Sequence, residues 1–481
     1  MALNRLAVFA AVALLAWVAA LLLIAAEVSQ IVNSFTLSML PVFVAVAGIA
    51  AHRSMRVTFN LIPYFFGSIF IFFCIGVALW PIATLSPYEF TSLISIDIEK
   101  RRLAQTACFL GISLSITILI YSLVTNAKSP VKFSHTVDKV SKVATDRRLG
   151  TIGINMMFIA LPIVSYRLYR ELAYILEAGY LALYADGISS AETVTWALPF
   201  NYIFYTGFGL ACAFVDQRKK FTIAAFMFLT VAFLDGMKGA RGAVIVPILF
   251  CWWFYSSRFV IKLRLGRLLV YALAAFCIFL GLTISRDPST IEGSASQFIV
   301  DAVATQGRSL QLTAIYMDEK EEVAKYGNMM ITSNLMIPIN VILHPELRDA
   351  PQSFDQVSYS NNLKHILTYT LNPDYYFAGG GTGGVYLIEL IESGWILFVL
   401  FSAALGWFFA RWPAMMRLPF WRFSSFQIFA TVFYMPRAEF FPNMLQFGKS
   451  ALIFILVLGM VDIAKGFRFG NRRLSESKNE I

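Results

Sequence analysis

Apolar runs of membrane-spanning length recur along most of the chain, and they restrict the possible folds more than any other feature. A helix that spans a bilayer needs roughly 20 predominantly apolar residues. Inside the bilayer every backbone polar group must be hydrogen-bonded internally, which leaves α-helices and closed barrels as the available structures. We expect about twelve helical spans. Their approximate bounds are 6–26, 31–51, 61–84, 104–125, 150–168, 195–215, 221–236, 242–257, 268–285, 383–410, 423–434 and 445–463.

The composition agrees with a membrane protein. The 481 residues are 58% hydrophobic and 14% charged, whereas a soluble domain carries roughly 25% charged residues. The sequence therefore predicts an all-α polytopic integral membrane protein, in which residues 1–481 form a single membrane domain. All the cysteines fall inside apolar runs, so we expect no disulfide and no zinc site. They are Cys74, Cys108, Cys212, Cys251 and Cys277.

The distribution of lysine and arginine predicts the orientation of the spans, since positive residues collect on the cytoplasmic side. With the N-terminus in the cytoplasm, 24 of the 39 lysines and arginines fall on inner segments, and every inner segment is basic. Both termini are then cytoplasmic, and 465–481 forms a basic tail beside anionic lipid. Residues 286–380 become one large outer loop. Because the net charge of +10 is spread over short loops, we expect no nucleic-acid partner.

The outer segment 170–187 carries apolar residues near helical spacing. Such a segment can lie flat in the membrane interface. It can equally be a short extension of the preceding span, and the sequence leaves both interpretations open.

Cationic side chains stand at the outer ends of neighbouring spans, where the positive-inside bias does not explain them. Three are arginines, Arg241, Arg286 and Arg437, and Lys238 precedes the first of these in a tight turn. A guanidinium fork matches phosphate oxygens and stays charged at any physiological pH. These residues are therefore candidates for binding an anionic, membrane-anchored substrate.

Internal pairing is the alternative to phosphate binding, because both outer turns also contain a carboxylate. Asp235 could neutralise Lys238 and Arg241, and Glu439 is close enough in sequence to pair with Arg437. The sequence leaves this choice open at each turn.

The large outer loop adds further polar candidates. Arg308 is another cation, while Tyr359, Asn361 and His365 supply groups of the kind that hydrogen-bond to sugar hydroxyls. We interpret the acidic run 318–322 as a solvated helix face.

A glycine-rich stretch, 379–384, closes the loop and precedes Glu389 and Glu392. The glycines do not form a dinucleotide-binding fingerprint, because no strand precedes them. We interpret them as a flexible entry to a helix whose N-terminus could face an anion. At spacing i, i+3 the two glutamates share one helix face near the membrane. They are candidates for a buried acid or base, or for partners of the arginines.

The arrangement resembles the O-antigen polymerases of the Wzy family, with the related enterobacterial common antigen polymerase and the O-antigen ligase. The resemblance covers most of the chain in layout. It is carried by five short motifs, at 177–184, 238–242, 336–351, 379–394 with Glu389, and 436–439.

The resemblance implies a glycosyltransferase of the GT-C type, in its metal-independent polymerase and ligase branch, and we expect no cofactor. It implies that a glycan on undecaprenyl pyrophosphate is transferred from its lipid onto a single lipid-linked repeat unit, with undecaprenyl pyrophosphate leaving. It also implies the bacterial inner membrane, an active site that faces the periplasm, and a chain-length regulator as a partner. The outer cations would then bind the pyrophosphate.

This reaction needs a base for the acceptor hydroxyl, and the candidates are Glu389, Glu392, His344 and His365. The chain departs from the ligase pattern, because it has no clear counterpart of that group's outer-loop histidine; His344 and His365 are stand-ins. Two alternatives stay open, an O-antigen ligase and a flippase or transporter for lipid-linked oligosaccharide. A transporter would more often carry charged or broken spans at the midplane, whereas the charges here gather at one face.

Overall fold

The chain is almost entirely helical wherever its structure is described, as the sequence predicts. The computed structural model describes residues 2–27, 30–54, 58–84, 86, 88–91, 95–126, 147–178, 195–238, 241–259, 295–327, 332–345 and 351–477. Within these ranges two short strands, β1 (Glu89–Thr91) and β2 (Ser95–Asp97), form an antiparallel hairpin.

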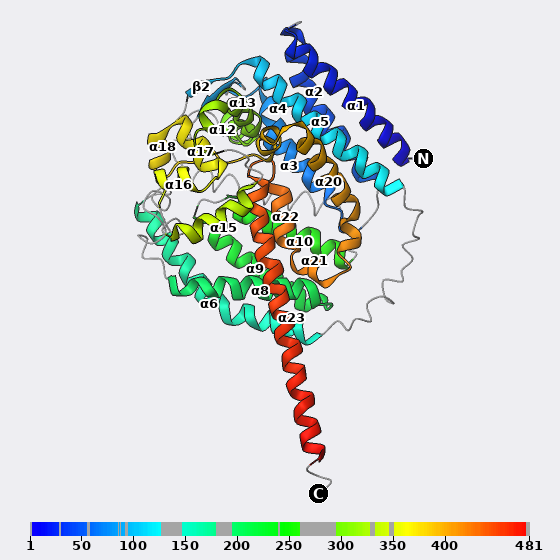
Figure 1. The fold of residues 1–481 in the computed structure, drawn as a ribbon, viewed down its shortest axis with the longest axis vertical. Coiled ribbons are helices and arrows are strands. Elements are labelled where there is room, and N and C mark those ends of the chain that lie inside the picture. Colours follow the sequence, from blue (N-terminus) through cyan, green and yellow to red (C-terminus); the bar gives the residue numbers. More distant parts are fainter. Residues whose placement is uncertain are drawn as a thin grey trace.

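The helices follow one another along the whole described chain (Figure 1). Their bounds are α1 (Ala2–Ala25), α2 (Gln30–Ser54), α3 (Ile62–Ile69), η1 (Phe70–Cys74), α4 (Ile75–Leu79), α5 (Lys100–Asn126), α6 (Arg147–Ala178), η3 (Thr195–Ala197), α8 (Leu198–Phe214), α9 (Arg218–Gly236), α10 (Arg241–Phe259), α12 (Ala295–Ala304), η5 (Thr305–Arg308), α13 (Ser309–Asp318), α14 (Lys320–Val323), α15 (Ser333–Leu343), α16 (Phe354–Tyr359), α17 (Leu363–Leu371), α18 (Pro373–Phe377), α19 (Tyr386–Glu392), α20 (Gly394–Met415), α21 (Pro419–Phe423), α22 (Ser425–Tyr434) and α23 (Phe440–Ser477).

Eight helical segments in the described part of the chain are long and apolar enough to cross a membrane. They lie in α1, α2, the continuous α3–η1–α4 segment, α5, α6, α10, α20 and α23. Helices α8, α9 and α22 coincide with three more expected spans but are not among the eight, and α22 has only 10 residues. The expected span 268–285 lies outside the described residues. A multi-pass helical membrane protein is thus supported, while the number twelve stays a prediction.

Helix α5 lies at the centre of a bundle with α1, α2 and α20 (Figure 1). Nearly every side chain between 103 and 118 is buried, which is typical of a helix enclosed by other helices. Small and hydroxyl residues allow the close contact. Gly111 faces the ring of Trp17, and the hydroxyls of Ser113 and Ser402 hydrogen-bond at 2.8 Å. Packing of this kind holds helices together in lipid, where apolar burial gives little driving force.

A second group of helices packs together separately from the bundle around α5. It consists of α6, α8, α9 and α10. Gly153 of α6 and Gly207 of α8 lie so close that a Cβ on either would overlap the carbonyl oxygen of the other. Phe208 of α8 stacks on Phe228 of α9 with ring centroids 3.9 Å apart. The glycines therefore set the distance between α6 and α8, and the aromatic rings fill the space beside them.

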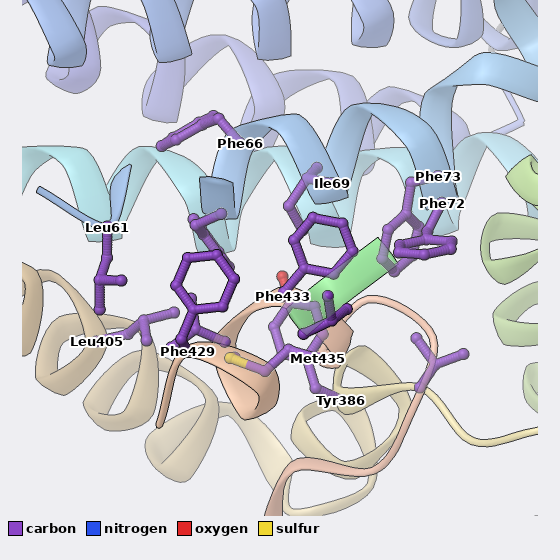
Figure 2. Close-up of a cluster of buried hydrophobic side chains, with 14 of the residues drawn as sticks. Leu61, Phe66, Ile69, Phe72, Phe73, Tyr386, Leu405, Phe429, Phe433 and Met435 are labelled. Atoms are coloured by element: carbon purple, nitrogen blue, oxygen red, sulfur yellow. The ribbon is translucent and has the colours of Figure 1, made fainter. Parts of the chain in front are cut away.

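An aromatic cluster connects the α3–η1–α4 segment to the C-terminal part of the chain (Figure 2). Phe72 meets Phe433 of α22 at 6.1 Å between ring centroids, and Phe73 meets Tyr386 of α19 at 6.3 Å. Both phenylalanines belong to η1, a π-helical turn. Such turns are rare inside α-helices, and those that occur are often found at functional sites. Here the π-helical turn lies directly beside the outer end of α22.

The described part of residues 286–380 is largely helical, and its α13 packs on α5 within the bundle. One expectation about the segment that follows needs correction. The expected continuous span 383–410 is wrong. Helix α19 ends at Glu392 and α20 begins at Gly394, which has φ +84°. Only glycine adopts this conformation readily, so it separates a short buried helix from the span that follows.

Two helices extend further than expected. Helix α6 continues to Ala178, so residues 170–178 extend the preceding span; residues 179–187 lie outside the described chain. Helix α23 continues to Ser477 and projects beyond the rest of the molecule (Figure 1). Most of the tail 465–481 is therefore helical, although the sequence gives it the polar, basic character of an unstructured end.

Candidate active site

The turn 435–439, between α22 and α23, lies against the glycine-rich stretch; it is called the outer turn here because the distribution of lysine and arginine predicts that it faces outward. The N–H of Tyr386 donates to the carbonyl oxygen of Met435 at 3.1 Å. Gly383 has φ +82°, and a Cβ there would lie 3.4 Å from the carbonyl oxygen of Arg437. A Cβ at Gly384 would overlap the carboxylate of Glu439. The glycines precede α19, as the sequence predicts, and they also permit the close approach of this turn.

Two buried glutamates, one in α19 and one at the end of this turn, hold the neighbouring elements together. Glu389 of α19 is fully buried, and its carboxylate accepts the N–H groups of Phe440 at 2.6 Å and Phe441 at 3.3 Å. These are the first N–H groups of α23, where a negative charge is favoured. Glu439 is 6% exposed and accepts the N–H of Lys364 at 2.7 Å. The two side chains thus join α19, α17 and α23.

Burial raises the pKa of Glu389 well above its ordinary value, and the charge of nearby Glu439 raises it further. The two backbone N–H groups act in the opposite direction. Desolvation and a neighbouring like charge both disfavour the ionised carboxylate. Glu392, one turn further along α19, is half-buried and adds a weaker effect of the same sign. The structure therefore keeps Glu389 in a setting that favours its protonated form.

Arg308 of η5 is near enough to Arg437 of this turn for the two charges to interact. Burial lowers the pKa of Arg308, and the positive charge of Arg437 lowers it further. The guanidinium of Arg437 lies over the ring of Phe72, 5.9 Å from its centroid. The charges of the two guanidinium groups therefore act on one another, although the groups belong to segments far apart in the sequence.

The position of Arg308 depends on a close contact between two glycines, Gly307 and Gly76. Gly307, the preceding residue in η5, contacts Gly76 of α4 so closely that a Cβ on Gly307 would overlap the backbone nitrogen of Gly76. A Cβ on Gly76 would in turn lie 3.1 Å from the carbonyl oxygen of Ala304. This contact presses η5 against the α3–η1–α4 segment. Arg308 and the π-helical Phe72 are therefore positioned by the same pair of elements.

Lys238 lies in a different environment, a closed network of four charged residues. Its ammonium bonds to Glu171 at 2.7 Å and to Asp235 at 2.5 Å, and Glu171 also pairs with Arg167 at 2.8 Å. Burial alone would lower the pKa of Lys238, but these two carboxylates raise it above its ordinary value. Internal pairing, the alternative that the sequence left open here, is what the structure contains. Glu171 of α6 is a partner that sequence reasoning missed.

Arg241 is the first residue of α10, and its side chain is not among those described. Its neighbour Gly242 lies against the hydroxyl of Tyr434, where a Cβ would overlap. The start of α10 therefore lies beside Tyr434, the last residue of α22. Tyr434 precedes Arg437 by three residues. Arg286 lies outside the described residues.

The two histidines occupy separate settings. The Nδ1 atom of His365 in α17 lies 3.0 Å from the hydroxyl oxygen of Tyr376. That hydroxyl donates to the carbonyl oxygen of Ser353 at 3.3 Å. Burial, and then the charge of Lys364, lower the pKa of His365 to about 3. His365 is therefore neutral at physiological pH and a weak proton acceptor.

His344 follows α15 and stacks on the ring of Tyr359, with centroids 4.3 Å apart. The side-chain amide of Asn340 donates to the carbonyl oxygen of Tyr359. Asn361 has φ +46° in the turn that leads to α17. Tyr359 and Asn361 thus lie around the short helix α16 and its following turn, and the structure associates His344 with Tyr359.

The acidic run 318–322 is a largely exposed helix face, as the sequence predicts. Glu322 pairs with Lys325 at 2.6 Å, and the exposed Asp318 pairs with Arg102 of α5 at 2.5 Å. The second pair connects α13 to the bundle.

Comparison with known proteins gives one match. None of the curated proteins or solved structures compared with the chain matches it. The family model described as O-antigen polysaccharide polymerase Wzy matches residues 6–465. That range includes every site residue described above and nearly the whole chain. The protein belongs to the O-antigen polysaccharide polymerase Wzy family.

Proposed function

We propose that this protein polymerises oligosaccharide repeat units carried on undecaprenyl pyrophosphate, at the periplasmic face of the bacterial inner membrane. The observation that supports this most directly is the meeting of Arg308 and Arg437 at an outer turn of a Wzy-family membrane protein. Both termini would be cytoplasmic, and the fold would be of the GT-C type.

The proposed reaction is a substitution at the anomeric carbon of the donor glycan. The acceptor hydroxyl oxygen forms a new bond to that carbon, while the bond between the carbon and the pyrophosphate oxygen breaks. Undecaprenyl pyrophosphate leaves with the electron pair, and the hydroxyl proton passes to a base. Arg308 and Arg437 stabilise the charge that develops on the leaving pyrophosphate. Arg241 and Arg286 are further proposed ligands, and Lys238 is not, because its charge is already balanced.

The surroundings of each candidate base narrow the choice. His365 is disfavoured, because a pKa of about 3 makes it a weak acceptor. Glu389 is fully buried and bonded to α23, so its role is to position the outer turn. We propose Glu439, which lies two residues from Arg437, as the proton acceptor. Glu392 and His344 are the alternatives, and replacing each by its neutral isostere in a polymerisation assay distinguishes them.

The neutral, hydroxyl- and amide-bearing residues Tyr359 and Asn361 are proposed to contact the glycan. A separate membrane protein that regulates chain length is a proposed partner. The lipid-linked oligosaccharide and the surrounding membrane lipid are the remaining partners in this proposal.

Deleting the gene tests the reaction class. We expect the deletion strain to make lipopolysaccharide whose core carries a single repeat unit, because a separate ligase would still transfer a monomer. The measurement is the ladder of lipopolysaccharide bands on a gel, with complementation by the intact gene as control. A core without any repeat unit would instead indicate a ligase or a flippase and would overturn the proposed polymerase.

A further inference from the structure

An apolar groove lies between α20, α22 and α23. Its volume is about 380 Å³, and aromatic rings form much of its wall. They belong to Phe401, Trp407, Phe408, Trp421, Phe440 and Phe447. Thr431 is the one lining residue with a hydroxyl or amide side chain. A cavity of this kind does not hold water or a glycan, because it offers them too few hydrogen-bonding partners.

One end of the groove lies next to residues of the candidate active site. Phe440 lines the groove, and its N–H is the one that Glu389 accepts at 2.6 Å. It lies three residues after Arg437. From Phe440 to Phe447 the groove follows α23 inward for roughly 10 Å, at 1.5 Å per helical residue. A molecule with a charged head at Arg437 could therefore extend an apolar tail directly into this groove.

The groove also opens sideways. Trp407 on its wall is 45% exposed, on a helix that is long and apolar enough to span the membrane. A second cavity of about 290 Å³ also borders α22 and α23, and its lining includes the amides of Gln427, Asn443 and Gln446 beside apolar side chains. Thr431 borders both spaces. The amide groups that this second cavity offers are absent from the described residues that line the groove.

We infer that the groove binds the first isoprene units of the polyprenyl chain of the lipid-linked substrate, while its pyrophosphate lies at Arg308 and Arg437. This inference rests on the proposed function. The branched chain fills a cavity with aromatic walls, and burial of its carbon atoms contributes affinity in proportion to the area removed from water. The groove thereby places the bond that breaks at the outer turn.

The test narrows the groove with a larger side chain and compares substrates whose polyprenyl chains differ in length. Ala404 lines the groove and is exposed, so Ala404→Trp narrows the groove without disturbing the interior. The control is Ala16→Trp, at an exposed alanine on the surface of α1. Polymerisation is measured with repeat units on undecaprenyl and on farnesyl pyrophosphate. We expect Ala404→Trp to lower the preference for the longer chain about tenfold, the equivalent of burying two methylenes, and Ala16→Trp to retain it.

A binding measurement separates this inference from the proposed function. Wild-type protein in nanodiscs is photolabelled with a benzophenone analogue of farnesyl pyrophosphate, with undecaprenyl phosphate or phosphatidylethanolamine as competitor. We expect labelled peptides from α20, α22 or α23, and competition by undecaprenyl phosphate only. Labelling elsewhere, equal competition by phosphatidylethanolamine, or an unchanged chain-length preference in Ala404→Trp would overturn the groove assignment. If labelling succeeds and the wild type makes no polymer, the proposed polymerase fails while the lipid groove stands.

Discussion

Two groups of charged residues, both at ends of helices that the sequence predicts to face outward, follow different electrostatic patterns. The lysine network consists of Arg167, Glu171, Asp235 and Lys238; the outer-turn cluster consists of Arg308, Arg437, Glu389 and Glu439. In the lysine network each carboxylate bonds to a cation. In the outer-turn cluster cation lies near cation and carboxylate near carboxylate.

We interpret this difference as one between a structural role and a proposed functional role. In the lysine network the opposite charges pair directly, and these pairs join α6 to the end of α9. In the outer-turn cluster burial and a like charge shift the pKa values of Arg308 and Glu389, and groups with shifted pKa values are common at functional sites. Lys238 and Arg437 are equivalent in the sequence, each a cation in an outer turn with a carboxylate nearby. Their surroundings assign them different tasks.

Replacing the arginines should have the largest effect on polymer formation. Arg437→Ala and Arg308→Ala should each lower the rate by about 10²–10³, the usual loss when a charge-assisted contact to the transition state is removed. Arg437→Lys should fall between the alanine variant and the wild type, because lysine keeps the charge without the planar fork. Polymer formation from purified lipid-linked repeat unit, at matched protein levels, measures this.

The matched control is Arg417→Ala, an exposed arginine that follows α20 at its other end. It should polymerise like the wild type. Wild-type rates for both Arg308→Ala and Arg437→Ala would refute the comparison, since the outer-turn cluster would then be as structural as the lysine network.

Breaking the lysine network should change stability more than catalysis. In Lys238→Met, Glu171 and Asp235 lose a cation whose side chain is only 12% exposed. Removing one partner of a buried pair costs about 3–5 kcal/mol. Thermal unfolding in detergent should show a clearly lower midpoint, while the rate per folded molecule stays close to that of the wild type.

Lys325→Met provides the control for this experiment, because Lys325 pairs with Glu322 on the surface. Exposed pairs contribute little to stability, so its unfolding midpoint should not move. A large loss of rate in folded Lys238→Met, without loss of stability, would return Lys238 to the substrate site.

The smallest expected effect is a change in the pH dependence of stability. The folded pKa of Glu389 is raised, so its stabilising contribution is fully present below the unfolded pKa near 4.5 and is lost as pH rises through the folded value. Glu389→Gln imitates the protonated form. The thermal unfolding midpoint of Glu389→Gln should therefore change less than that of the wild type between about pH 5 and about pH 9.

Glu321→Gln, at an exposed glutamate of α14, should leave the wild-type pH profile unchanged. If Glu389→Gln shows the same pH dependence as the wild type, the carboxylates of the outer-turn cluster are not electrostatically strained. The contrast with the lysine network would then rest on the arginines alone.

Part of the candidate site could be predicted from residue types and their places between spans. Arg437, Arg308 and Glu389 were all identified in this way. Glu439 was considered only as a partner for Arg437, and Glu171 was missed, because its partner Lys238 lies 67 residues away. The break at Gly394 was also missed, since the apolar run from 383 to 410 continues through a residue whose φ the sequence does not show.

The sequence by itself determined the class of the protein. Hydropathy and the placement of lysine and arginine are sums over local residues, so they predict a multi-pass helical membrane protein without reference to its packing. Which cation meets which carboxylate was decided only by the tertiary structure. Glycine contacts such as Gly76 with Gly307 bring η5 to the π-helical turn, and Gly384 brings Glu439 to α19. Electrostatic energy depends on distances between elements far apart in the chain, and packing alone sets those distances.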